Sequence, residues 1–117
     1  MARYVDGFVI PIQKSKLKAY LRMAKMGAKV WKEHGALAYT ETVGDDLKAP
    51  MGMGFPKMAR LKRGETVVFA WVVYRSKAHR DKVNAAIMKD PRMEMKGPMP
   101  FDPRRFAMGG FEVLVSW

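Results

Sequence analysis

The chain has 117 residues, a length that suits one domain with one hydrophobic core, and we expect that domain to span residues 1–117. It contains no cysteine, which excludes disulfides, thiol chemistry and cysteine-ligated zinc. Its 22 Lys and Arg against 11 Asp and Glu give a net charge of +11, which attracts polyanions. No apolar run approaches the roughly 20 residues of a membrane helix and no signal peptide is recognisable, so we expect a cytoplasmic protein without membrane contact.

The first half of the chain predicts strand, helix, strand and loop. Residues 3–12 predict a strand, with Tyr4, Asp6, Phe8 and Ile10 on one side and Val5 and Val9 on the other. Residues 15–34 repeat apolar side chains at helical spacing, and Gly35 is a typical helix stop. Residues 36–43 predict a second strand, whereas 44–64 are rich in Gly and Pro and predict an extended loop.

The second half predicts strand, helix, loop and strand, over residues 65–74, 76–89, 94–105 and 106–115. Ser76 is a suitable N-cap for the helix, and Pro91 disfavours helix at the residue before it. The pair Gly109-Gly110 predicts a bulge or a close backbone approach in the last strand.

The resulting order, β-α-β-β-α-β, is the ferredoxin-like pattern of an α+β protein, with two helices on one face of a four-stranded antiparallel sheet. The third strand is apolar on both sides, since Phe69 and Trp71 alternate with Val68, Ala70 and Val72. A sheet with one face in water should alternate in polarity, and no element remains to cover the second face. We therefore predict a symmetric homodimer whose sheets pack face to face as a dimeric α/β barrel.

Several stretches of the chain then carry a family likeness: "YVDGFVIPI", "AKVWKEHGALAYTE", "GETVVFAWVVYRSKAHRDKVNAAIMKDPRM", and "MPFD" followed by "GGF". With them the chain resembles the YbaA-like family of small bacterial proteins over nearly its whole length. The resemblance implies the dimeric α/β-barrel fold and a homodimer. It implies no reaction, because none is firmly assigned to that family, and the cofactor-free monooxygenases of this fold are an analogy of fold only.

Two positions depart from the pattern that the resemblance implies. Lys18 stands where family members tend to have an acidic residue, and Met108 stands where an aromatic residue is usual before "GGF". These departures indicate either a divergent member or an engineered variant.

A basic stripe follows the first predicted helix at spacings of four and three residues: Lys18, Arg22, Lys25, Lys29 and Lys32. Like charges at these spacings repel, and Glu33 is the single acidic residue that relieves them. The stripe predicts either a solvated lysine face or an anion-binding face. In the second case the protein binds polyanions, including nucleic acid, without sequence specificity and with strong salt dependence.

The same helix carries a second apolar stripe, formed by Ala19, Met23, Met26 and Val30. We place it roughly opposite the core-facing side, where one buried face does not account for it. Either another part of the dimer covers it, or it is an extra interface of a higher-order assembly, which an engineered assembly component would provide.

The two histidines, His34 and His79, predict structural roles first. His34 ends the first helix, where a cation suits the helix dipole, and His79 falls at the core boundary of the second helix. In a functional alternative, a small-ligand pocket at one end of the dimer interior contains Trp31, His34, Tyr39 and Trp71. We expect no metal site, since two histidines without cysteine leave too few ligands, and we expect no cofactor.

We therefore predict a homodimeric structural or small-ligand-binding protein in which no catalytic set is recognisable. Three alternatives remain open: an engineered component of a larger assembly, a cofactor-free oxygenase or isomerase with its pocket in the dimer interior, and a polyanion binder.

Overall fold

The computed structural model describes residues 3–95 and 97–117. Its elements are β1 (Tyr4–Gln13), the 3-10 helix η1 (Lys14–Lys16), α1 (Leu17–Glu33), β2 (Ala38–Val43), α2 (Phe55–Met58), β3 (Glu65–Tyr74), α3 (Lys77–Lys89), the 3-10 helix η2 (Pro91–Met93) and β4 (Ala107–Glu112). No helix among the described residues is long and apolar enough to cross a membrane.

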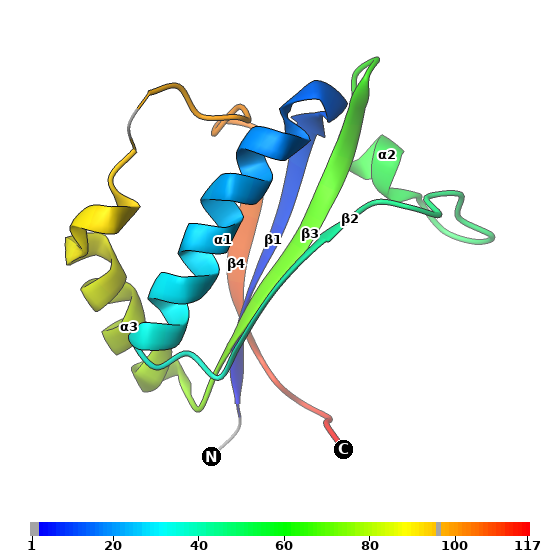
Figure 1. The fold of residues 1–117 in the computed structure, drawn as a ribbon. Helices are drawn as coiled ribbons and strands as arrows, with labels where there is room; N and C mark the ends of the chain where they lie inside the picture. The colour runs from blue at the N-terminus through cyan, green and yellow to red at the C-terminus, as the bar shows by residue number, and fades with distance from the viewer. Residues whose placement is uncertain (1–2, 96) are drawn as a thin grey trace.

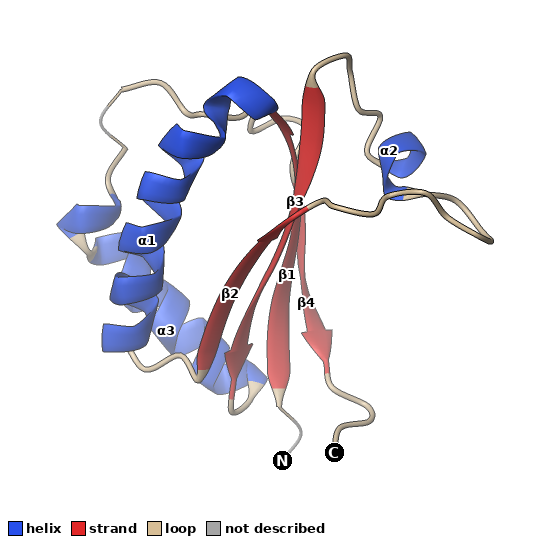
Figure 2. Ribbon diagram, turned by 45° about the vertical axis from the view of Figure 1, so that its right-hand side comes forward, coloured by secondary structure: helices blue, strands red, loops and turns tan. Residues whose placement is uncertain are grey.

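The four strands form one antiparallel sheet in the order β2-β3-β1-β4. The central strand β1 pairs Tyr4 with Tyr74 on one side and with Glu112 on the other. Helices α1 and α3 lie side by side on one face of this sheet, as Figures 1 and 2 show. The prediction of a ferredoxin-like α+β fold is confirmed.

The core lies between the helices and the sheet, in two neighbouring clusters. One cluster holds Ile10, Ile12, Tyr20, Ala24, Val68 and Ala70, and the other holds Val30, Val72, Tyr74, Val83 and Ile87. Alternation along β3 sends every second side chain into this layer. Val68 and Ala70 thereby join the first cluster, and Val72 and Tyr74 join the second.

The helix ends follow the predicted signals. Gly35 has φ of 103°, and the Ala36 N–H reaches back to the Trp31 carbonyl at 3.0 Å, which closes the end of α1 as glycine-terminated helices do. At the start of α3, the Ser76 hydroxyl accepts the His79 N–H at 3.1 Å, so the predicted N-cap is confirmed. Pro91 follows Asp90, whose extended backbone ends α3.

The second apolar stripe of α1 does not lie opposite the core. Val30 is fully buried beneath the helix, and Met23 packs against the first core cluster. Ala19 is half-buried, and Met26 alone of the four is exposed. The placement of Val30 on an outer stripe is therefore wrong. The buried arc of α1 is wider than one stripe because the helix contacts α3 and η2 as well as the sheet.

The last strand is shorter than predicted and contains no bulge. β4 pairs residue for residue with β1 through Gly109 and Gly110. The close approach to Gly110 is made by a side chain and not by backbone, because a Cβ on Gly110 would collide with the Tyr4 hydroxyl. The segment beyond Glu112 leaves the sheet and exposes Leu114, Val115 and Trp117.

The open face of the sheet, turned away from α1 and α3, is partly covered by the chain itself. The segment between β2 and β3, expected to be a plain loop, contains α2 and lies on this side (Figure 2). Phe55 of α2 approaches Phe69 with ring centroids 6.1 Å apart. Val67 is only 2% exposed, whereas Phe69 and Phe111 remain 45% and 61% exposed. The expectation that no element covers this face therefore holds only for part of it.

Candidate functional site

A cavity of about 150 Å³ lies between α1 and the helix-covered face of the sheet. Strands β1, β2 and β3 form its floor, α1 forms one wall, and the segments around η2 and before β4 close another. Its walls are mostly aromatic and methionine side chains, namely Phe8, Met23, Trp31, Met93, Phe101 and Phe106. Such an apolar enclosure with few polar groups is typical of small-molecule sites.

The polar group of this cavity is the Glu41 carboxylate on β2. Oε1 accepts the hydroxyl of Tyr20 from α1, and Oε2 accepts the hydroxyl of Tyr39 from β2, both at 2.6 Å. Tyr39 and Glu41 are two residues apart in a strand, so both point into the layer beneath α1. Burial, and then the hydrogen bond to Glu41, raises the pKa of each tyrosine above its usual value, so both stay protonated donors.

A glycine on α1 lets this group assemble. Gly27 is buried in the cavity wall, and a Cβ there would lie 2.8 Å from the Tyr39 hydroxyl and 3.8 Å from the Trp31 ring. The two rings themselves pack with centroids 5.7 Å apart. The missing side chain at Gly27 therefore gives Tyr39 the space to reach Glu41.

Of the four predicted pocket residues, the structure brings Trp31 and Tyr39 together in the cavity. Trp71 also borders it, but alternation along β3 places its side chain on the open face, where its ring centroid is 5.5 Å from that of Phe69. His34 lies elsewhere, at the end of α1. The cavity lies between helix and sheet, and not on the sheet face where the dimer interior was expected.

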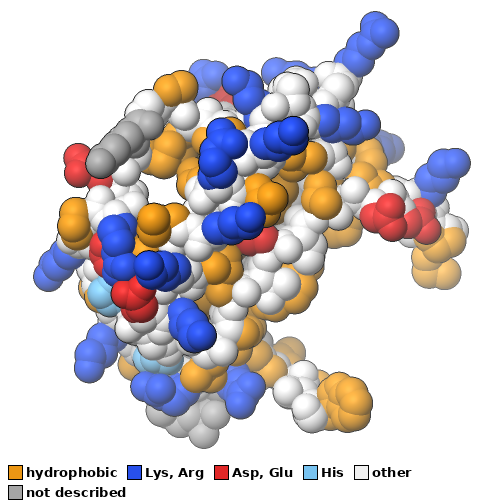
Figure 3. Space-filling model, in the orientation of Figure 1, with side chains coloured by type: hydrophobic (Ala, Val, Ile, Leu, Met, Phe, Trp, Pro, Cys, Tyr) orange, Lys and Arg blue, Asp and Glu red, His pale blue; other side chains and the backbone are white. Residues whose placement is uncertain are grey.

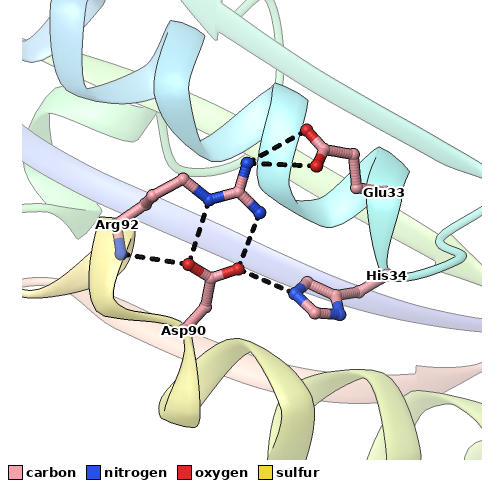
Figure 4. A network of polar contacts seen from close by, with 4 residues as sticks. All are labelled: Glu33, His34, Asp90 and Arg92. Atoms are coloured by element: carbon pink, nitrogen blue, oxygen red, sulfur yellow. Dashed lines mark hydrogen bonds and ion pairs between the residues drawn. The ribbon is translucent and has the colours of Figure 1, made fainter.

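His34 belongs to a polar network that joins the end of α1 to η2 (Figure 4). Its Nε2 lies 2.9 Å from Asp90 Oδ2, and the Arg92 guanidinium binds both oxygens of Asp90. Arg92 also donates to both carboxylate oxygens of Glu33 at 3.0 and 3.1 Å. These hydrogen bonds hold the pKa of Asp90 well below its usual value. The network fixes η2, and with it the cavity wall at Met93.

A second buried polar network lies next to the cavity, beneath α3. Asp6 is 1% exposed, and its carboxylate accepts the Arg80 guanidinium at 2.8 Å and the Tyr74 hydroxyl at 3.0 Å. Asn84 also donates to Asp6, at 3.3 Å. Trp31 links the two regions, because its indole N–H donates to the Tyr74 hydroxyl at 3.1 Å while its ring borders the cavity.

His79 lies at the core boundary of α3, where the sequence predicts it. Its Nδ1 accepts the Arg75 N–H at 3.0 Å, and its ring packs edge-on against Tyr74 with centroids 6.0 Å apart. Burial, followed by the charge of Arg75, lowers the pKa of His79, so the neutral ring is the favoured form.

The basic stripe of α1 is exposed at each of its positions, Lys18, Arg22, Lys25, Lys29 and Lys32. Figure 3 shows basic side chains gathered over α1 with hydrophobic ones between them. Anion binding by this stripe stays a prediction.

Among residues 3–95 and 97–117, no group of three or more His, Asp or Glu residues is placed to hold a metal ion. The arginines that precede β4 are paired: Arg104 with Asp102, and Arg105 with Glu65 at 2.6 Å.

Comparison with known proteins places the chain in a family. Residues 3–103 match the family described as "Protein of unknown function (DUF1428)". The chain belongs to the DUF1428 family. The resemblance to YbaA-like proteins is thereby confirmed, since the chain is 40% identical over 115 residues to "Uncharacterized protein YbaA" of Escherichia coli strain K12. That match covers 97% of this chain and 98% of the relative, and the Shigella flexneri protein of the same description matches equally well.

A solved structure shares the fold of this DUF1428 member. It is the crystal structure of a dimeric ferredoxin-like protein from an uncultured marine organism, with a TM-score of 0.63 and complete coverage of both chains. At 12% identity the likeness supports the fold alone.

Sequence reasoning missed the centre of the cavity. Tyr20 falls within the apolar repeats of the helix predicted over residues 15–34, and the sequence indicates no role for Glu41. The alternation of β2 was the available signal, because it places Glu41 on the same face as Tyr39, where an acidic residue beneath a helix requires a partner. The strand pattern predicts Asp6 on the same side as Phe8 and Ile10, but its partners on α3 come from more than 70 residues away.

Proposed function

We propose that this chain is a homodimeric protein that binds a small, largely apolar ligand in the cavity beneath α1. The observation that carries the proposal is the Glu41 carboxylate, held by Tyr20 and Tyr39 at the edge of an otherwise apolar space of about 150 Å³. An apolar cavity of this size accepts a benzene-sized molecule, and a fixed polar group gives such a ligand its orientation.

Titration of the isotopically labelled protein with benzyl alcohol tests ligand binding. We expect amide shifts confined to α1, β2 and the neighbouring cavity walls. Ala24→Leu, at a buried cavity position, should abolish these shifts by filling the space, whereas Ala85→Leu on the exposed side of α3 should retain them. The absence of shifts at millimolar ligand, or equal shifts in the Ala24→Leu variant, would overturn the proposal.

The open face of the sheet supports the homodimer. Phe69 and Phe111 are exposed there, and they border an apolar hollow of about 200 Å³. Large apolar side chains grouped on one face of a sheet are typical of a subunit interface. The structural neighbour described as dimeric shares this fold over the full chain. A second copy, related by two-fold symmetry, would cover the part of this face that α2 leaves open.

Light scattering on a sizing column tests the dimer. We expect the wild-type protein to elute as a dimer and Phe69→Lys as a monomer, because a lysine at the centre of the interface would be buried without a partner. Met88→Lys is the matched control: Met88 is 87% exposed on α3, outside the open face, and this variant should remain dimeric. A wild-type monomer, or a dimeric Phe69→Lys variant, would contradict the assignment.

A second candidate is a cofactor-free isomerase or oxygenase that uses the same cavity. Glu41 favours it, since a carboxylate in an apolar enclosure is placed to accept a proton from a bound carbon acid. Deuterium exchange into a bound small ketone in D₂O tests this function. Exchange by the wild type that Glu41→Gln loses would support catalysis, and exchange equal to buffer alone would exclude it.

A further inference from the structure

The charge of Glu41 distinguishes the cavity from the other polar sites of the molecule. Six carboxylates of the structure contact an arginine: Asp6, Glu33, Glu65, Asp81, Asp90 and Asp102. Glu41 interacts instead with two neutral hydroxyls. The chain carries 22 lysines and arginines, yet none within residues 3–95 and 97–117 lines this cavity. A partly buried negative charge without a cation is costly unless something compensates it.

The cavity walls are suited to compensate that charge with a ligand cation. Tyr20 and Tyr39 contact the carboxylate, and Trp31 lines the same cavity. Phe101 packs edge-on against Tyr20 with centroids 6.0 Å apart. The faces of aromatic rings carry partial negative charge and attract ammonium groups, and aromatic enclosures of this kind bind organic cations in proteins. A carboxylate and several rings around one small space therefore favour a positively charged ligand over a neutral one.

The hydrogen bonding of Glu41 narrows the type of cation. Each of its oxygens accepts one tyrosine hydroxyl and retains a second acceptor position. A primary or secondary ammonium can donate N–H bonds to these positions, whereas a quaternary ammonium has none to give. A volume of about 150 Å³ limits the organic part to about one ring or a short branched chain.

We propose that the cavity beneath α1 is a binding site for small primary or secondary organic ammonium ions, with Glu41 as the counter-ion and the tyrosine hydroxyls as its positioning groups. This inference rests on the proposed ligand-binding function of the same cavity. It adds the chemical class of the ligand. The net positive charge of the whole protein opposes the approach of a cation, so the selectivity must arise from groups within the cavity.

Calorimetric titration with two isosteric probes, benzylamine and benzyl alcohol, at neutral pH tests the proposal. We expect benzylamine to bind at least tenfold more tightly than benzyl alcohol. Glu41→Gln should remove that preference, and Glu112→Gln, at an exposed glutamate of β4, should leave it unchanged. Tyr39→Phe keeps the carboxylate but removes one of its positioning hydroxyls, so we expect weaker binding that still prefers benzylamine. A retained preference in this variant would show that a disturbed cavity alone does not explain the loss in Glu41→Gln.

The outcomes separate the two proposals. Equal binding of both probes, or a preference that survives in Glu41→Gln, overturns the ammonium class and leaves the ligand-binding function intact. Binding of neither probe at millimolar concentration overturns both.

Discussion

Two carboxylates lie beneath the helices of this protein, Asp6 fully buried and Glu41 partly buried, and they differ in what surrounds them. Asp6 contacts a guanidinium, a tyrosine hydroxyl and an amide, all from its own chain. Glu41 contacts two tyrosine hydroxyls and borders an open cavity. The Asp6 carboxylate therefore has its charge and hydrogen-bond partners within the fold, whereas the Glu41 carboxylate is available to a ligand.

Charge balance, more than burial, separates a structural network from a candidate site in this molecule. Asp6 has an internal cation in Arg80, whose guanidinium also lies 4.9 Å from the centre of the Tyr4 ring. Tyr4 in turn fills the space above Gly110. This region contains the cation that a ligand would bring to the other, so we expect it to stabilise the fold and bind nothing.

The largest expected effect comes from breaking the Asp6 network. Asp6→Asn leaves the mostly buried Arg80 without its buried counter-charge, and we expect the free energy of unfolding to fall by about 3–5 kcal/mol. Asp81→Asn removes the other carboxylate that contacts Arg80, but Asp81 is exposed, so its loss should cost less than about 1 kcal/mol. Urea unfolding measures both, and equal losses would contradict a structural role for Asp6.

A smaller effect is expected where α1 meets the cavity. Gly27→Ala gains about 0.5–1 kcal/mol of helix stability but pushes Tyr39 away from Glu41, a charge-assisted bond of about 1.5–3 kcal/mol. We expect a net loss of about 1–2 kcal/mol in urea unfolding, together with weaker benzyl alcohol binding. Comparing Lys29→Ala with Lys29→Gly, on the exposed side of α1, isolates the helix contribution. A net gain in stability at Gly27 would show that Tyr39 adapts without cost.

A still smaller effect is expected from breaking the hydrogen bond between Trp31 and Tyr74, which links the two regions. Trp31→Phe keeps an aromatic wall in the cavity but removes the N–H donated to Tyr74, which should lower the free energy of unfolding by about 0.5–1.5 kcal/mol. Trp71→Phe makes the same exchange on the opposite face of the sheet and serves as the control. If both variants lose the same stability, the hydrogen bond to Tyr74 contributes nothing measurable.

The smallest expected effect is a pH dependence at His79, which packs against Tyr74. Because the pKa of His79 is lowered on folding, the unfolded chain takes up a proton near pH 6.5 before the folded protein does. Stability from this residue is therefore present above pH 6.5 and decreases as the pH falls below it. We expect the urea midpoint to decline between pH 7.5 and 5.5, and His79→Gln to show a shallower decline; parallel curves would refute the assignment.

Most of the fold could be predicted from local patterns. The apolar run of β3 was predicted with its observed limits, Glu65 and Tyr74, because no polar residue interrupts it. The end of β4 was not predicted, because "VLV" at 113–115 has strand character but too little of β1 lies opposite. β1 begins at Tyr4, which pairs with Glu112, and Val113 adds only one bond to Arg3. Strand length depends here on the partner, which composition does not encode.

The candidate site was less accessible to sequence reasoning, because its parts meet only in the folded chain. Tyr20 and Glu41 come from a helix and a strand 21 residues apart, and each is ordinary in its own element. The helical spacing also misplaced Val30, since α1 packs on two neighbours and buries a wider arc than a single sheet requires. Aromatic residues such as Trp31 and Tyr39 could be singled out, but the cavity between them depends on Gly27.

The central position of β1 bears on how the chain folds during its synthesis. β1 is translated before both of its neighbours in the sheet, which are β3, beginning at Glu65, and β4, ending at Glu112. Contacts between residues so far apart in sequence raise the contact order and slow folding. During synthesis β1 therefore lacks both of its strand partners until β3 and β4 have been made. In this interval its apolar residues are exposed to aggregation and to chaperone binding.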